Sequence, residues 1–162
     1  MKLSLIALLI FIAPGFSYSQ SKDEPNYYFG LNLPETKAKL RQYKDFFNYK
    51  LSYIEYDTTI ELTITKDSAT WIIYSVFYFD ESGKCYSIKN RYCGPNASKG
   101  LESILASKDY RWQKLNINKY LSKYSKSEQL EIIDDKDCSQ YRRTKLNLTR
   151  KEYKQLKSRV TN

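Results

Sequence analysis

The residues that stand out for their chemistry are cations gathered toward the C-terminal end of the chain. Residues 140–162 hold eight Lys or Arg against one Glu, a net charge of +7, whereas residues 20–139 hold eighteen against seventeen, a net charge of +1. Arg meets phosphate, sulfate and carboxylate groups through paired hydrogen bonds, and Lys meets them as a point charge. The predicted anion-binding residues are Arg142, Arg143, Lys145, Arg150, Lys151 and Lys154. The alternative is that these cations form only a solvated face.

Other kinds of chemistry find little support in the residue types. The chain contains no histidine, which excludes Ser–His and Cys–His hydrolase sites and histidine-ligated zinc sites. Asp134, Asp135 and Asp137 lack the glycine and the distal glutamate of an EF-hand loop, so a solvated turn is favoured over a calcium site. The acids within residues 55–61 are read as surface charges. We predict no catalytic residue, metal or cofactor.

Three cysteines bear on the compartment in which the protein works. If 84–92 is one extended strand, Cys85 and Cys93 lie roughly 26 Å apart, far beyond the ~7 Å between Cα atoms that a disulfide allows. Cys138 should therefore bond one of them, and we favour Cys93 because both would lie at the ends of elements. The alternative is three reduced thiols. Lys84 could lower the pKa of Cys85, but without histidine a catalytic thiol is not predicted.

The N-terminal residues have the pattern of an export signal. Lys2 precedes a short apolar run, and Ser17 and Ser19 are small residues at the −3 and −1 positions of a cut before Gln20. We therefore expect residues 1–19 to be a signal peptide cleaved after Ser19, an uncleaved anchor being the alternative. The mature chain, 20–162, is then one secreted or periplasmic domain with no transmembrane segment.

The helices are predicted from capping signals and apolar spacing. Asn32 with Glu35 forms a capping box before a helix over 34–48, and Thr149 with Glu152 forms another before a basic amphipathic helix over 150–160. A short helix is also expected over 97–107.

Alternating apolar residues predict the strands. They are expected over 60–65, 71–79, 84–92 and, less regularly, 110–115 and 130–133. Residues 50–57 allow one bent strand or two short ones, and residues 118–126 look weakly helical. The predicted fold is an α+β domain, with an antiparallel sheet of about four to five strands, helices packed on one face and an amphipathic basic C-terminal helix.

The functional prediction follows from this uneven charge. We expect a non-enzymatic binding module whose basic C-terminal region contacts an anionic polysaccharide, a lipid headgroup or an acidic protein. Export argues against a nucleic-acid partner. A first alternative is a protein–protein interaction or inhibitor module that uses a tyrosine-rich sheet face, since the chain has 16 Tyr. A second is an enzyme of unknown reaction that uses carboxylates.

Overall fold

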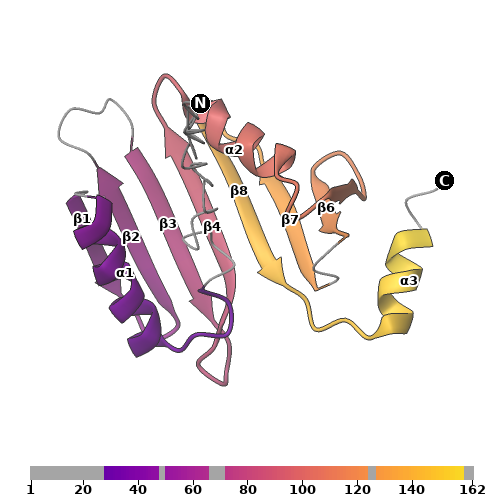
Figure 1. Cartoon of the computed structure of the whole chain (residues 1–162), viewed down its shortest axis with the longest axis horizontal. Coiled ribbons are helices and arrows are strands. Elements are labelled where there is room, and N and C mark those ends of the chain that lie inside the picture. Colours follow the sequence, from indigo (N-terminus) through magenta and orange to yellow (C-terminus); the bar gives the residue numbers. More distant parts are fainter. Residues whose placement is uncertain (1–27, 48–49, 66–71, 124–126, 159–162) are drawn as a thin grey trace, which may run out of the picture.

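One antiparallel sheet carries the fold. The computed structural model describes residues 28–47, 50–65, 72–123 and 127–158, and across these residues the chain forms eight strands and three helices (Figure 1). The strands lie side by side in the order β1-β2-β3-β4-β8-β7-β6-β5. The strands are β1 (Lys50–Glu55), β2 (Thr59–Thr65), β3 (Ile72–Phe79), β4 (Cys85–Cys93), β5 (Trp112–Lys114), β6 (Lys119–Ser122), β7 (Glu128–Ile133) and β8 (Cys138–Lys145). The helices are α1 (Leu33–Phe47), α2 (Ala97–Ala106) and α3 (Arg150–Ser158).

The first four strands form a meander of neighbours in sequence. β1 and β2 are two strands rather than one bent strand, joined by a short turn closed by the hydrogen bond from the Tyr56 N–H to the Thr59 carbonyl, 2.9 Å. The turn between β3 and β4 is held by the Asp80 carboxylate, which accepts the Ser82 and Lys84 N–H groups at 3.0 Å each. Gly83 supplies the positive φ of 71° that this turn needs.

The second half of the sheet grows in the opposite direction along the chain. After β4 the chain forms α2 and the outer strands β5, β6 and β7, and only then returns as β8 to pair with β4. Each of these pairings is antiparallel. The central β4–β8 ladder therefore joins segments that are separated by the whole of the second half.

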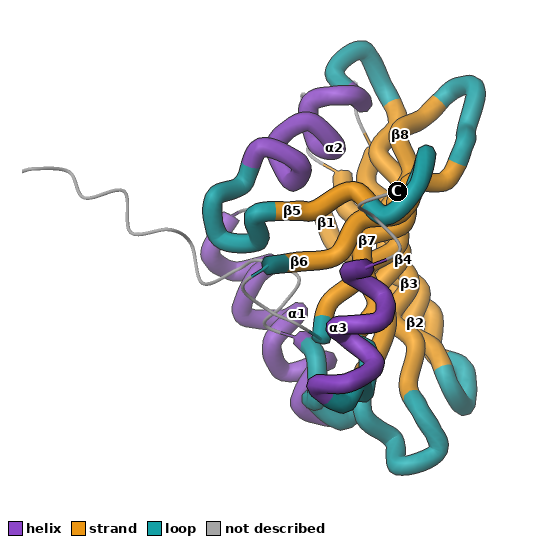
Figure 2. Tube along the Cα trace, turned by 90° about the vertical axis from the view of Figure 1, so that its right-hand side faces the viewer, coloured by secondary structure: helices purple, strands orange, loops and turns teal. Residues whose placement is uncertain are grey.

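Helices α1 and α2 lie on the same side of the sheet, which we call the helix face (Figure 2). The opposite side is called the open face. Beneath the helices are two hydrophobic clusters, one under α1 and one under α2. The first consists of Tyr28, Leu40, Ile60, Leu62, Ile64, Phe77, Phe79, Cys85 and Ile88. The second consists of Ile104, Tyr110, Leu130 and Tyr141.

The fold class predicted from the sequence is wrong. The sheet has eight strands across the described residues rather than four or five, and strands outweigh helices, so the architecture is mostly β. Residues 118–126 were expected to be helical but contain β6. Residues 130–133, expected as a less regular strand, lie in β7, between β6 and β8. The strand β8 was missed altogether. Helix α3 does not pack on the sheet with the others, since none of its residues is buried.

Several local predictions are confirmed. Both capping boxes form, with Asn32 and Glu35 exchanging hydrogen bonds of 2.7 and 2.9 Å. In the second box the Thr149 N–H donates to Glu152 Oε2 at 2.7 Å, and the Glu152 N–H donates to the Thr149 hydroxyl at 3.3 Å. The hairpin of β3 and β4 also forms as expected.

The structure bears on the prediction about membrane spans but not on the prediction of an export signal. Among the described residues, no helix combines the length and the apolar character needed to cross a bilayer. The predicted signal peptide, residues 1–19, lies outside the described residues.

Candidate functional site

The sheet separates the two consecutive arginines of the predicted anion-binding set. Arg142 and Arg143 are neighbours in β8, so their side chains project to opposite faces. Arg143 points to the helix face, where its side chain is 0% exposed and its Nη2 donates to Glu128 Oε2 at 2.6 Å. The guanidinium carbon lies 4.4 Å from the ring centroid of Tyr110 and 5.6 Å from that of Phe29. Arg143 is therefore a core residue and cannot reach an external anion.

The burial of Arg143 explains why its surroundings are aromatic as well as acidic. A buried charge needs a partner, and Glu128 supplies one. Within the described parts of the chain, Nε and Nη1 of Arg143 have no hydrogen-bond partner, but ring faces attract a cation. The guanidinium is thus held by one carboxylate and two aromatic rings.

Arg142 lies on the open face in a group of tyrosines and cations. Its guanidinium carbon is 5.4 Å from the ring centroid of Tyr78, and it pairs across the ladder with Lys89. Tyr74 is 38% exposed and pairs with Arg91 on the neighbouring strand. The open face therefore presents flat aromatic rings beside positive charge.

The remaining predicted cations are exposed and lie around α3. We call Lys145, Arg150, Lys151, Lys154 and Lys157 the C-terminal basic surface; Lys157 joins the predicted residues because it lies on the same helix. All five are exposed. Within the described residues none of them forms an ion pair, so their charge is available to a partner.

The single acid of this segment does little to offset that charge. The carboxylate of Glu152 accepts hydrogen bonds from the backbone and the hydroxyl of Thr149, both at 2.7 Å. These bonds lower the pKa of Glu152, and the bond from the Thr149 hydroxyl has the larger effect. The carboxylate is therefore committed to the start of α3.

Helix α3 also has an apolar side. Tyr153 and Leu156 lie three residues apart on one side of the helix and are only partly buried. Figure 1 shows α3 at the end of an extended segment that follows β8, beside the sheet rather than upon it. The helix thus combines basic residues with an apolar stripe that the sheet does not bury.

The acidic residues considered for metal or acid–base chemistry serve other contacts. Arg91 Nε donates to Asp135 Oδ2 at 2.7 Å, which lowers the pKa of Asp135. Glu55 pairs with Lys37 of α1 on the helix face, whereas the ladder places Glu61 on the open face opposite Val76. Among the described residues, no group of three metal-ligating side chains occurs.

The predicted disulfide is confirmed. Cys93 and Cys138 are bonded, with their Cα atoms 4.5 Å apart, and they occupy directly paired positions of β4 and β8. Cys85 is the free thiol. It is buried, and burial raises its pKa to about 12 in spite of the neighbouring Lys84, which is exposed. The thiol is therefore protonated at neutral pH.

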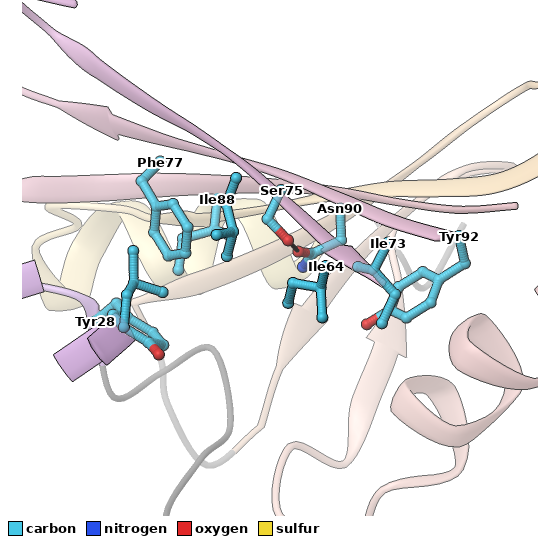
Figure 3. Close-up of a pocket in the computed structure, with 10 residues that line it drawn as sticks. Tyr28, Ile64, Ile73, Ser75, Phe77, Ile88, Asn90 and Tyr92 are labelled. Atoms are coloured by element: carbon cyan, nitrogen blue, oxygen red, sulfur yellow. Dashed lines mark hydrogen bonds between the residues drawn. The ribbon is translucent and has the colours of Figure 1, made fainter. Parts of the chain in front are cut away.

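The structure also contains a cavity that the sequence analysis did not predict. It lies on the helix face against β2, β3 and β4, is partly open, and has a volume of about 110 Å³. Apolar side chains, among them Leu62, Ile73 and Ile88, make most of its wall, and Leu40 of α1 also lines it. Figure 3 shows Tyr28 on the side of the cavity opposite the sheet. Apolar cavities with a few polar groups are the usual form of small-molecule sites.

The polar groups of the cavity come from facing positions of β3 and β4. Ser75 pairs with Asn90 in the ladder, and its hydroxyl donates to Asn90 Oδ1 at 2.7 Å (Figure 3). Asn90 is 4% exposed, and its Nδ2 makes no hydrogen bond of ordinary length and angle with any described residue. A weak interaction with Asn90 opposes the rise in the pKa of the buried Tyr141 hydroxyl. The Tyr92 hydroxyl, 3.3 Å from that of Tyr141, lies nearby.

A signal for this cavity was present in the sequence. Ser75 interrupts the apolar run of β3, and Asn90 occupies a core-facing position two residues from Ile88. Polar residues at core-facing positions of two adjacent strands indicate a pair of side chains that hydrogen-bond to each other. The pair is recognisable only when the register of the hairpin is known.

Comparison with known proteins gives no relative from which a function could be transferred. No family model, no curated protein and no solved structure matches this chain.

Proposed function

We propose that this chain is an exported binding module that attaches to an anionic lipid surface through the C-terminal basic surface. Five exposed cations without ion pairs among the described residues, gathered on and beside one helix, carry the proposal. Cations near an anionic membrane each contribute on the order of 1 kcal/mol to binding. The module has no catalytic step in this proposal.

The apolar side of α3 favours a lipid surface over the other anionic partners. A basic amphipathic helix lies in the plane of the membrane, with its cations at the headgroups and its apolar residues below them. Tyr153 and Leu156 are placed for that second role. A polysaccharide or an acidic protein would use the cations alone, so these partners predict no effect of the apolar residues.

The proposed location is outside the cytoplasm, in the periplasm or beyond the cell. The export signal expected over residues 1–19, with a cut after Ser19, supports it. The Cys93–Cys138 disulfide supports it as well, because disulfides persist in oxidising compartments.

Vesicle sedimentation tests the proposal. The exported protein should bind vesicles of 70% phosphatidylcholine and 30% phosphatidylglycerol, bind pure phosphatidylcholine weakly, and lose binding as salt rises. Changing all five residues of the C-terminal basic surface to Gln should reduce the partition coefficient at least tenfold. The matched control changes five other exposed lysines to Gln: Lys99, Lys108, Lys114, Lys123 and Lys136. Equal losses in the two variants would contradict a specific role for α3.

A second variant separates lipid from other anions. Leu156→Ser should weaken vesicle binding several-fold and leave retention on a sulfated polysaccharide column unchanged. Retention that depends on the five cations, with vesicle binding indifferent to Leu156, would assign the surface to a polysaccharide or an acidic protein instead.

A protein partner on the open face is the second candidate. Tyr78 beside Arg142 and Tyr74 beside Arg91 give this face the aromatic and Arg content that is enriched in protein interfaces. Tyr74→Ser should then abolish a chemical cross-link to the partner that the five-Gln variant retains. The reverse pattern would favour α3.

A further inference from the structure

The cavity on the helix face contains a buried polar group whose hydrogen-bonding capacity is largely unused among the described residues. Its wall is largely apolar, yet Asn90 brings to it a buried amide donor that has only a weak interaction with the Tyr141 hydroxyl and, among the described residues, no hydrogen bond of ordinary length and angle. More than nine in ten buried polar groups in native proteins are hydrogen-bonded, and an unpaired one costs roughly 1–3 kcal/mol. A donor left in this position suggests a group that arrives from outside the chain.

The hydrogen bond from Ser75 fixes the amide. Because the Ser75 hydroxyl donates to Oδ1, the amide oxygen is engaged and Nδ2 is the end left over. Figure 3 shows the two side chains leaving the sheet together, with the Asn90 nitrogen on the cavity side, beside Ile64. The pairing therefore presents a donor, rather than an acceptor, to whatever occupies the cavity.

The size and charge of the cavity limit its occupant. Its volume of about 110 Å³ compares with the roughly 150 Å³ of an engineered apolar cavity that holds benzene. None of the described residues that line it is acidic or basic, and burial raises the pKa of Tyr92, so this hydroxyl is neutral. A carboxylate or phosphate would be buried there without a counter-charge, which is costly.

We propose that the cavity binds a small neutral molecule with an apolar body and one hydrogen-bond acceptor, such as a ketone or an ester, and that the acceptor is held by Asn90 Nδ2. The apolar body would lie against Leu62, Ile73 and Ile88. This site is separate from the C-terminal basic surface and does not depend on the function proposed for it.

A pair of ligands that differ in one atom group provides the probe. Cyclohexanone carries an acceptor, and methylenecyclohexane has a methylene group in place of that oxygen on the same ring. Titrations of the isotope-labelled exported protein, followed by amide chemical shifts in β3 and β4, give the affinity of each. Both should bind, and cyclohexanone should shift the amides around Ser75 and Asn90.

The variant Asn90→Leu tests the donor. Cyclohexanone should lose about tenfold in affinity, as expected for one hydrogen bond, whereas methylenecyclohexane should bind as well as before or better. The ratio of the two affinities is the readout, so a general loosening of the fold, which affects both probes alike, does not imitate the result. An unchanged ratio would overturn the assignment of Asn90.

A blocking variant tests the cavity itself. Ile73→Phe should fill the space and abolish binding of both probes, whereas Ile72→Phe, on the open face of the same strand, should leave binding intact. Failure of both probes to bind the native protein would overturn the proposal and assign the cavity to water.

Discussion

Arg143 of β8 and Glu128 of β7 form an ion pair inside the protein, diagonally across the ladder in which Leu130 faces Arg143 and Glu128 faces Lys145. The guanidinium also lies near the rings of Tyr110, which belongs to the cluster under α2, and of Phe29, which packs against the cluster under α1. One charged side chain therefore connects the two halves of the core.

Removal of this arginine should destabilise the fold severely. Arg143→Met leaves Glu128 buried without a cation, and breaking a buried pair in this way costs about 3–5 kcal/mol. The free energy of unfolding, measured by urea denaturation, should fall by that amount. Arg142→Met, one residue away on the open face, is the matched control and should cost less than about 1 kcal/mol.

A double variant identifies the cause of that loss. Replacing both members of a buried pair by apolar residues of similar size is often neutral, so Arg143→Met with Glu128→Leu should recover most of the stability. Equal losses in the single and double variants would instead indicate that contact with the aromatic rings dominates.

The Cys85 thiol should resist alkylation in the native protein. Only the thiolate reacts, and burial raises the pKa of this thiol to about 12 from an ordinary 9.0. Iodoacetamide at pH 8 should therefore label Cys85 only after denaturation, as read by mass spectrometry, with Cys85→Ala as the control. Rapid labelling of the native protein would contradict the burial of this residue.

The same pKa shift makes the stability of the fold depend on pH. The unfolded chain releases the thiol proton near pH 9 and the folded chain only near pH 12. The contribution of Cys85 to the free energy of unfolding is therefore complete below pH 9 and is lost as the pH rises toward 12. Cys85→Ala should flatten this part of the pH profile.

Loss of the disulfide should lower stability without changing the fold. Cys93 and Cys138 close a loop with a sequence separation of 45, for which removal of the bond costs roughly 2–4 kcal/mol. The urea midpoint of a Cys93→Ala, Cys138→Ala variant should fall accordingly, and reduction of the native protein should give the same shift. An unchanged midpoint would show that the unfolded chain is not held by the bond.

The pair of Asp135 with Arg91 predicts an acid-sensitive contribution. The hydrogen bond from Arg91 lowers the pKa of Asp135 below its ordinary 3.8, so the stabilisation is present above that pH and disappears as acid protonates the folded carboxylate. Asp135→Asn should lower the urea midpoint at pH 7, and the difference should shrink below pH 4. Asp134→Asn, which removes an exposed carboxylate, should have no such effect.

The parts of the fold that the sequence predicted are those set by local patterns. The β3–β4 hairpin follows from apolar residues on each side of a turn that needs Gly83, and both capping boxes follow from residues three positions apart. The disulfide was predictable because the strand assignment excluded a bond between Cys85 and Cys93.

The parts that were missed depend on pairing between distant segments. β8 has Tyr141 and Arg143 at its core-facing positions. Because one of these residues is an arginine, the segment lacks the alternation of apolar and polar residues that predicts a strand. The burial of Arg143 depends on Glu128, Tyr110 and Phe29, which the fold alone brings together. The cavity likewise could not be predicted without knowing that Ser75 pairs with Asn90 across the hairpin. The residue pattern of α3 predicts a helix but does not predict where that helix lies relative to the sheet.

The covalent bond between β4 and β8 also records an alignment. A slip of one residue in this ladder would turn Arg143 toward solvent and put Arg142 in the core, since the side chains of a strand alternate between faces. Cys93 and Cys138 are directly opposed in the ladder. In an unfolded chain that keeps its disulfide, these two residues therefore stay paired, and this pairing favours the native register over the register shifted by one residue. The sheet can then form outward from the β4–β8 pair toward both edges, with each strand added to a neighbour that is already in the native register.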